Sequence, residues 1–314
     1  MPGLGWEHLK FDNFKNFIDK NTFIRRIELS NYGEVFLNPD LCKIIRYAAK
    51  RKISLSIGNG ANLNHASDEV LEQLVRAKVK VLKVSIDGLS QEAYEKYRVG
   101  GSVENVLQNV EKINLYKRRY RSSWPEMIWQ YVIFGHNEHE IEEARAKSKE
   151  LNMKFITQLS WNPGWSPTKN AAFMEKKFRG IHILKTDTET VYEYSEFSAC
   201  FQMWKSPQIN SDGKLLGCCE NHHWGDYGNV FEEGYINVLE GERFTYAKQM
   251  LQGKVPARND IPCTSCHKYK AMKENNKWFD PEEIFQPAGK SAENNVFSVK
   301  NRNTAVPEMT QTSH

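Results

Sequence analysis

Residues 1–160 alternate between short apolar runs and longer amphipathic stretches, and this alternation constrains the fold more than any other feature. The apolar runs predict five strands, at 24–31, 53–58, 81–87, 127–135 and 154–161. The stretches between them have helical periodicity; in "NPDLCKIIRYAAKRK" Asn38 can cap a helix and Pro39 suits its first turn. Strands that alternate with helices form parallel sheets joined by right-handed crossovers. The pattern predicts an α/β fold, either an open doubly wound sheet or a partial barrel.

The first predicted element is a helix, at about 6–20, rather than a strand. Each helix of a β–α repeat follows a strand, so we expect the partner of this helix to lie before Met1. Beyond about residue 190 the repeat stops, and Cys, Gly, Trp and His become frequent. The polar, aperiodic segment 287–314 predicts disorder. We therefore expect a partial barrel at 1–190, a cysteine-rich domain at 191–286 and a disordered tail.

Composition narrows the class of protein. Hydrophobic residues make up 40% and charged residues 26% of the chain, as in ordinary soluble proteins. The formal net charge of +4 argues neither for nor against nucleic acid, and no segment approaches the ~18 apolar residues of a membrane span. We expect no nucleic-acid and no membrane partner. The N-terminus has no apolar signal core, and six cysteines are too few for a disulfide scaffold, so we expect a cytoplasmic protein with reduced thiols.

Five of the six cysteines lie between residues 200 and 266. The segment "CFQMWKSPQINSDGKLLGCC" predicts a hairpin at "NSDGK" that returns Cys218 to Cys200, and "IPCTSC" supplies Cys263 and Cys266 on a tight turn. Four such thiolates form a closed site that suits either zinc or a four-iron cluster. A redox disulfide is the weaker alternative for the C-x-x-C pair, because that motif belongs at a strand-to-helix junction. Cys219 is expected to point away.

Other candidate ligands have simpler interpretations. Cys42 lies on the apolar face of a predicted helix, where a small buried side chain is the expected role. His222, His223 and Asp226 could ligate a metal, but adjacent side chains of a strand face opposite ways. Surface or packing roles are therefore expected for these three.

Small or polar residues follow four consecutive predicted strands: Gly33 and Glu34, then Asn59 and Gly60, then Ser85, Asp87 and Arg98, and finally Asn137. Each group alone could be a turn or a helix cap. Ligands of parallel α/β folds bind at these strand ends, so together the groups predict a site for one polar ligand that carries both an amine and a carboxylate. At the last two strand ends His136, Gln158 and Trp161 are weaker candidates for substrate contact.

Two stretches carry a family resemblance. The segment "LSNYGEVFLNPDLCKIIRYAAKRKISLSIGNGANL", followed by "VLKVSIDGLSQEAYEKYRVGG", resembles the core of radical S-adenosylmethionine (radical SAM) enzymes. The later segment resembles the auxiliary iron–sulfur domain of their SPASM and twitch branch, with Cys200, a hairpin, Gly213 and Cys218 separated by four residues, a gap, then Cys263 and Cys266. The resemblance covers about 20–280.

The resemblance implies a partial (β/α)6 TIM-like barrel lacking its first strand, plus a small C-terminal cysteine-rich iron–sulfur domain. In the family a Gly-Glu stretch holds the amino group of S-adenosylmethionine, which implies this role for Gly33 and Glu34, although the usual Gly-Gly-Glu-Pro reads Tyr-Gly-Glu-Val here. Ser85 and Arg98 match residues that contact the ribose and the carboxylate of the cofactor. Matched less closely are Asn59 and Asn137. One auxiliary [4Fe-4S] cluster is implied, with four ligands: Cys200, Cys218, Cys263 and Cys266.

The chain departs from the family at one point. The defining Cys-x-x-x-Cys-x-x-Cys loop, whose cluster generates the 5′-deoxyadenosyl radical, is absent from the sequence, and Cys42 is the first cysteine. We expect a truncated or late-started form of a radical SAM oxidoreductase rather than a degenerate complete protein. A form with that loop would hold a second [4Fe-4S] cluster, abstract hydrogen from a peptide or small molecule, and take electrons from flavodoxin or ferredoxin. The alternatives are a non-catalytic zinc- or iron–sulfur-binding scaffold and a pseudoenzyme.

Overall fold

A curved parallel sheet organises the first half of the protein. The computed structural model describes residues 7–160, 162–178, 181–185, 190–194, 199–221 and 225–284. The sheet contains β1 (Arg26–Glu28), β2 (Ser54–Ala61), β3 (Val81–Ser85), β4 (Glu126–Ile133) and β5 (Lys154–Leu159). All five strands are parallel and lie in chain order, without the reversal that a doubly wound sheet requires. The structure therefore confirms the α/β fold and selects the partial barrel.

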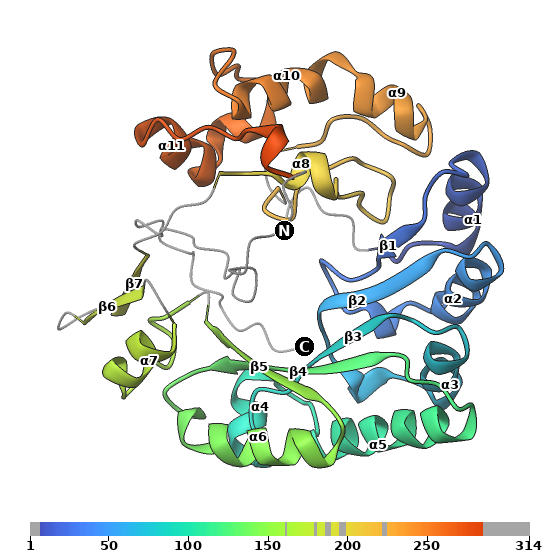
Figure 1. Ribbon diagram of the computed structural model, residues 1–314, viewed down its shortest axis with the longest axis vertical. Helices are drawn as coiled ribbons and strands as arrows, with labels where there is room; N and C mark the ends of the chain where they lie inside the picture. Colours follow the sequence, from blue (N-terminus) through green and yellow to red (C-terminus); the bar gives the residue numbers. More distant parts are fainter. Residues whose placement is uncertain are drawn as a thin grey trace, which may run out of the picture.

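Helices cover one face of this sheet. They are α1 (Phe11–Lys20), α2 (Leu41–Lys50), α3 (Asp68–Arg76), α4 (Gln91–Tyr97), α5 (Val103–Arg119) and α6 (Ile141–Glu150), with the short turns η1 (Val35–Leu37), η2 (Leu63–His65) and η3 (Glu138–Glu140). Figure 1 shows α2, α3, α5 and α6 on the outer side of the curved strands. Because all crossovers run in one direction, the inner side is left for other groups.

The start of α2 differs slightly from the expectation. The helix begins at Leu41, and Asp40 rather than Asn38 occupies the capping position. The Asn38 side chain accepts a hydrogen bond from the Asp40 backbone nitrogen at 2.9 Å and donates one to the Leu9 carbonyl at 3.0 Å. Asn38 therefore forms a turn before the helix and ties it to the segment that enters α1.

Alternate residues of each strand face opposite sides of the sheet, as a period of two requires. On β3, Leu82 and Val84 are buried in the core beneath the helices. Lys83 and Ser85 alternate with these two residues along the strand and face the inner side. The inner side therefore carries polar side chains, whereas the core lies between the sheet and its helices.

A second, smaller unit follows. Its elements are α8 (Gln202–Lys205), α9 (Tyr235–Glu240), α10 (Glu242–Leu251), η4 (Pro262–Ser265), α11 (His267–Glu274) and η5 (Pro281–Ile284). Between the two units lie α7 (Ala171–Lys177) and the hairpin of β6 (Ile181–Lys185) and β7 (Thr190–Tyr194). Two clusters of buried apolar residues divide the core, the first spanning 14–183 and the second 203–279. The predicted boundary at 190/191 falls at this hairpin, and the predicted tail lies outside the described residues.

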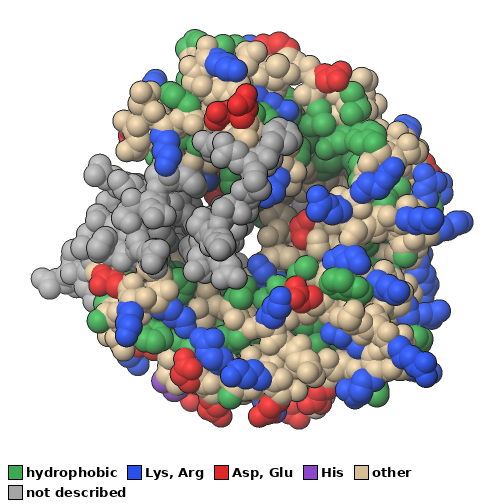
Figure 2. All heavy atoms as spheres, in the orientation of Figure 1, with side chains coloured by type: hydrophobic (Ala, Val, Ile, Leu, Met, Phe, Trp, Pro, Cys, Tyr) green, Lys and Arg blue, Asp and Glu red, His purple; other side chains and the backbone are tan. Residues whose placement is uncertain are grey.

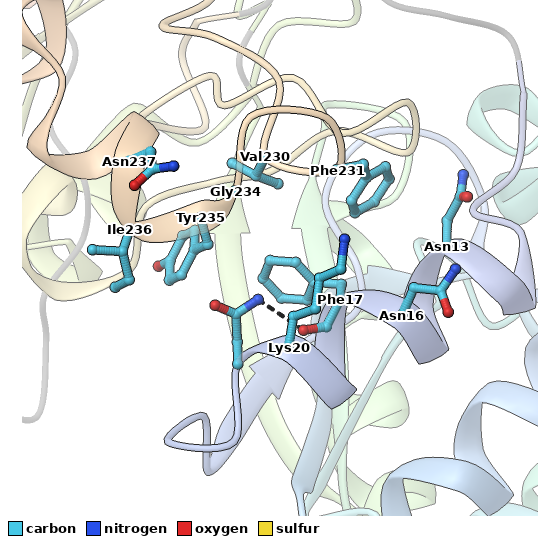
Figure 3. Close-up of a pocket in the computed structure, with 11 residues that line it drawn as sticks. Asn13, Asn16, Phe17, Lys20, Val230, Phe231, Gly234, Tyr235, Ile236 and Asn237 are labelled. Atoms are coloured by element: carbon cyan, nitrogen blue, oxygen red, sulfur yellow. Dashed lines mark hydrogen bonds between the residues drawn. The ribbon is translucent and has the colours of Figure 1, made fainter.

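Helix α1 joins the two units. The ring of Phe17 packs edge-on against Phe231 and Tyr235, with centroids 6.0 and 5.4 Å apart. Figure 3 shows these rings around a cleft of about 240 Å³ between α1 and the 230–237 segment. The second unit is thereby held against the edge of the barrel at which β1 lies (Figure 1). Among the described residues, no helix combines the length and apolar character needed to cross a membrane.

Candidate functional site

The ends of β1 and β2 are tied together by Glu28. Its carboxylate accepts hydrogen bonds from the Ser30 hydroxyl at 2.6 Å and from the Gly58 backbone nitrogen at 2.7 Å. The Ser30 oxygen accepts from the Asn59 backbone nitrogen at 3.0 Å, and the Asn59 amide donates to the Ser30 carbonyl. Asn59 therefore lies at a strand end as expected, with its amide engaged by the neighbouring strand. Sequence reasoning missed Glu28, although an acid at an alternate position of an apolar strand was the available signal.

Glu34 lies in the loop after β1. One carboxylate oxygen accepts from the Phe36 backbone nitrogen at 3.1 Å, and the other accepts from the Asn62 backbone nitrogen at 2.7 Å. Burial raises the pKa of Glu34, while these two hydrogen bonds and the nearby Arg98 act to lower it. Gly33, with φ of +74°, precedes it in a conformation that favours glycine. The carboxylate is thus fixed in position and keeps lone pairs for a further donor.

The end of β3 carries a buried ion pair. The Asp87 carboxylate is fully buried and accepts from Arg98 Nε at 2.7 Å and Nη2 at 2.6 Å. Its other oxygen accepts from the Val132 backbone nitrogen at 2.6 Å. Arg98 is thereby held at the mouth of the barrel, where its charge also acts on Glu34. The sequence placed Asp87 and Arg98 near one ligand but did not predict that they bind each other.

Ser85 is buried beneath the C-terminal end of β2. A Cβ atom at Gly60 would lie 2.5 Å from the Ser85 hydroxyl oxygen and 3.1 Å from Gln130 Nε2. Gly60, with φ of +92°, is therefore required both for its conformation and for this close approach. Ser85 and Gln130 are register partners on β3 and β4, and both side chains are buried polar groups. A ribose contact for Ser85 stays a prediction.

Asn137 is fully buried and its amide is used inside the protein. The amide nitrogen donates to the carbonyls of Asp87 at 2.8 Å and Val132 at 2.9 Å, and the amide oxygen accepts from the Phe134 backbone nitrogen at 2.8 Å. These bonds connect the ends of β3 and β4. Asn137 thus supports the residues at the barrel mouth, and a direct cofactor contact stays a prediction.

The structure describes two of the three weaker candidates for substrate contact. His136 Nδ1 lies 2.7 Å from the Ser166 hydroxyl, and its ring stacks on Phe134 and meets Trp165 edge-on. His136 Nε2 is buried without a hydrogen-bond partner among the described residues. Gln158 is the inner-face register partner of Val132. Trp161 lies outside the described residues.

Figure 2 shows the molecule hollowed near its centre, on the side of the sheet away from the helices, with charged side chains beside the hollow. The inner-face residue Lys83 is close enough to Glu28 for the acid to raise its pKa, although burial lowers that pKa more. A polar, partly buried inner face of this kind suits a charged small molecule better than an apolar one.

Four cysteines converge in the second unit. Burial raises the pKa of the Cys200, Cys218, Cys263 and Cys266 thiols, and that of Cys263 reaches about 12. Each of the four also lies close enough to the other three for their charges to interact. A cation that accepts four thiolates would relieve this repulsion, so the donor set fits a tetrathiolate metal centre. Loading it must release protons.

A hairpin and a short turn position three of these thiols. Residues 209–215 form the expected hairpin, with the Gly213 nitrogen donating to the Asn210 carbonyl at 3.0 Å and a bridge between Ile209 and Leu215. Cys263 lies in η4, and the Cys266 nitrogen donates to the Cys263 carbonyl at 3.0 Å. Burial dominates the pKa of Cys266, but the backbone N–H groups of Lys268 and Tyr269 act to lower it. The thiolate form is therefore favoured locally once a cation offsets burial.

The remaining cysteines are placed differently. The pKa of Cys219 is raised by burial and by the charges of Glu220 and Cys200, and its backbone nitrogen donates to Gln202 Oε1 at 3.1 Å. Cys42 lies on α2 beside Glu69 and Arg46, far along the chain from any other thiol. His222 and His223 lie outside the described residues. In the described part of the chain, no three His, Cys, Asp or Glu side chains are grouped tightly enough to hold a single ion.

Tyr32 connects the two sites. It precedes Gly33 in the loop after β1, and its pKa is raised by burial and by the charges of Cys219, Glu220 and Cys218. The loop that carries Glu34 therefore lies within electrostatic reach of the segment that carries Cys218, which the order of the motifs along the chain could not show.

Comparison with known sequences now decides the family. The profile of the Radical SAM superfamily matches residues 7–147, and that of the SPASM iron–sulfur cluster-binding domain matches residues 200–267. The chain belongs to the radical SAM superfamily. The superfamily match covers the barrel strands β1 to β4, and the SPASM match begins at Cys200 and ends one residue after Cys266. A search of curated proteins finds no significant match.

Solved structures agree with the fold of this radical SAM protein. SuiB from Streptococcus suis superposes with a TM-score of 0.57 at 13% identity, over 88% of this chain and 71% of SuiB. At that identity the similarity establishes the fold alone. The structure of BtrN in complex with AdoMet and 2-DOIA has a TM-score of 0.44 at 14% identity, over 82% of this chain and 80% of BtrN. That TM-score adds nothing to the assignment.

The two clusters expected of the family fit this chain unequally. The four thiols predicted to hold the auxiliary cluster lie within electrostatic reach of one another. The radical-generating cluster needs three thiolates in one loop, and the only cysteine of the printed sequence before Cys200 is Cys42 on α2. The residues present do not fit that second cluster.

Proposed function

We propose that this chain binds S-adenosylmethionine at the strand ends of the barrel and holds one auxiliary [4Fe-4S] cluster. The observation that carries the proposal is the convergence of four thiols from three separate segments, each within electrostatic reach of the others. The SPASM match over the same residues supports it. Domain boundaries at 190/191 and 286/287 belong to this proposal.

Iron–sulfur chemistry is favoured over zinc by the family match, because the profile that spans Cys200 to Cys266 describes an iron–sulfur cluster-binding domain. Four thiolates by themselves suit either a zinc ion or a four-iron cluster.

The barrel mouth supports an amino-acid-like ligand. Glu34 presents a fixed carboxylate that can accept from an ammonium group, and Arg98 has N–H groups beyond the two that Asp87 binds. These opposite charges lie close together, as the amine and carboxylate of one cofactor would require. We propose Gly33, Glu34, Asn59, Ser85, Arg98 and Asn137 as the cofactor-binding residues, with Asn59 and Asn137 acting through the loops they hold.

The proposed reaction is hydrogen abstraction from a peptide or small molecule. In the family, a cluster held by three thiolates supplies the electron that cleaves S-adenosylmethionine to the 5′-deoxyadenosyl radical. Because the residues present do not hold that cluster, we assign this chain cofactor binding and the auxiliary cluster only. We propose flavodoxin or ferredoxin as the electron donor for an assembly that includes the missing thiolates.

Anaerobic purification followed by metal and sulfide analysis tests the cluster. About four iron and about four sulfide per chain are expected, with the same values in Cys42→Ser. One zinc per chain and no sulfide would instead support the non-catalytic zinc-binding alternative.

Equilibrium dialysis against labelled S-adenosylmethionine tests the barrel. We expect weak binding that is lost in Glu34→Ala. Glu69→Ala, which removes a carboxylate on the outer face of α3, should keep it. Equal binding by both variants would refute the assigned site.

A further inference from the structure

One cysteine sulfur has a side-chain partner that the family motifs do not include. The Tyr227 hydroxyl lies 3.2 Å from Cys263 Sγ. The side chain of Tyr227 is 6% exposed, so water does not compete for its hydroxyl. Tyr227 lies outside the cysteine pattern, in the segment that follows the hairpin of Cys218.

The ring of Tyr227 is clamped. A Cβ atom at Gly217 would lie 2.9 Å from Tyr227 Cε2, so the ring packs directly on the Gly217 backbone. Phe244 meets the other side edge-on, with centroids 5.1 Å apart. The Tyr227 backbone nitrogen donates to the Leu215 carbonyl at 2.9 Å, which fixes Tyr227 to the hairpin. The hydroxyl is therefore held beside its hydrogen-bond partner, Cys263 Sγ.

The chemistry of a metal ligand sets the direction of this hydrogen bond. A cysteine that ligates iron is a thiolate and has no proton to donate, so the phenol must be the donor. A hydrogen bond to a ligand sulfur favours the reduced, more negative form of an iron–sulfur cluster. Removing the bond should therefore make the cluster harder to reduce.

We propose that Tyr227 is a positioning residue that raises the reduction potential of the auxiliary cluster by donating a hydrogen bond to Cys263. The inference rests on the proposed function, because it requires an iron–sulfur cluster at the four cysteines. The competing interpretation is that Tyr227 only fills the core of the second unit.

Tyr227→Phe and Tyr269→Phe are a matched pair of variants. Tyr269 belongs to the same buried cluster and is 4% exposed, and the charge of Cys263 reaches its hydroxyl. No hydrogen bond from Tyr269 to a cysteine sulfur occurs among the described residues. Both substitutions keep the ring and remove one hydroxyl, so only the contact with sulfur distinguishes them.

The experiment is an anaerobic redox titration monitored by electron paramagnetic resonance, on full chains with iron and sulfide determined first. We expect the potential of Tyr227→Phe to shift to a more negative value at unchanged iron content, and Tyr269→Phe to titrate as the unsubstituted protein does. An unshifted Tyr227→Phe, or equal shifts in both variants, would overturn the inference and leave the proposed cluster intact. An unsubstituted protein without iron would overturn both.

A second measurement begins with the unsubstituted protein. The phenol proton is exchangeable and lies beside the cluster, so electron–nuclear double resonance of the reduced, unsubstituted protein should show a coupled proton that disappears in D₂O. The signal should persist in Tyr269→Phe and be absent from Tyr227→Phe. A signal that survives in Tyr227→Phe, or its absence from the unsubstituted protein, would contradict the assignment.

Discussion

Arg98 binds the buried carboxylate of Asp87 through two of its nitrogens, Nε at 2.7 Å and Nη2 at 2.6 Å. The pair links α4, which ends just before Arg98, to the end of β3. It also positions the charge of Arg98 near Glu34. A structural ion pair thus orients a residue that we propose for ligand binding.

Removing the acid of this pair should destabilise the barrel. Asp87→Ala leaves Arg98 without its partner and the Val132 nitrogen without its acceptor, so we expect a loss of about 3 kcal/mol in the free energy of unfolding. Urea titration followed by circular dichroism measures it. Asp68→Ala breaks the exposed pair with Lys112 and should cost less than about 1 kcal/mol. Similar losses in both variants would contradict the importance of burial.

Two adjacent cysteines should behave differently. Cys218 interacts with all three other proposed ligands, whereas the charge that most affects Cys219 is that of Glu220. Cys218→Ser should therefore lose most of its iron after anaerobic reconstitution, and Cys219→Ser should retain it. Iron and sulfide per chain are the measurement. If Cys218→Ser kept its iron and Cys219→Ser lost it, Cys219 rather than Cys218 would be the ligand.

Gly60 should not tolerate a side chain. Gly60→Ala places a methyl group 2.5 Å from the Ser85 oxygen at a φ of +92°, and should cost about 2 kcal/mol of stability. Gly100 also has a positive φ, of +73°, but nothing lies within 4 Å of its Cβ position. Gly100→Ala should therefore cost less, about 1 kcal/mol. Equal losses in thermal unfolding would show that the contact with Ser85 contributes nothing.

Glu34 should contribute a pH dependence to stability. Because burial raises its pKa in the folded protein, the folded state binds more protons than the unfolded chain between the unfolded and folded pKa values. The contribution is therefore fully present below the unfolded pKa and is lost as the pH rises through the folded pKa. Glu34→Gln should remove this part of the pH dependence. The measurement is the free energy of unfolding in urea of the variant and of the unsubstituted protein, each determined from pH 4 upward, near the ordinary Glu pKa of about 4.3. Parallel curves would contradict it.

Much of the fold followed from sequence, whereas the residues of both sites stay predictions. The five strands, their parallel arrangement and the hairpin before Cys218 were predicted from periodicity and turn residues, and the structure confirms them. The choice of a barrel over a doubly wound sheet needed the strand order. The four cysteines were selected from spacing because ligands of one centre recur at short, characteristic intervals.

The sequence by itself determined which residue types stand at each strand end and which thiols return to one place, because both depend on local periodicity and turns. Only the tertiary structure decided how those groups are used. Asn137 and Asp87 form their hydrogen bonds inside the protein, Tyr227 contacts Cys263, and Tyr32 lies within electrostatic reach of Cys218. These pairings join residues far apart in the chain, and a buried polar group binds the partner that packing brings to it.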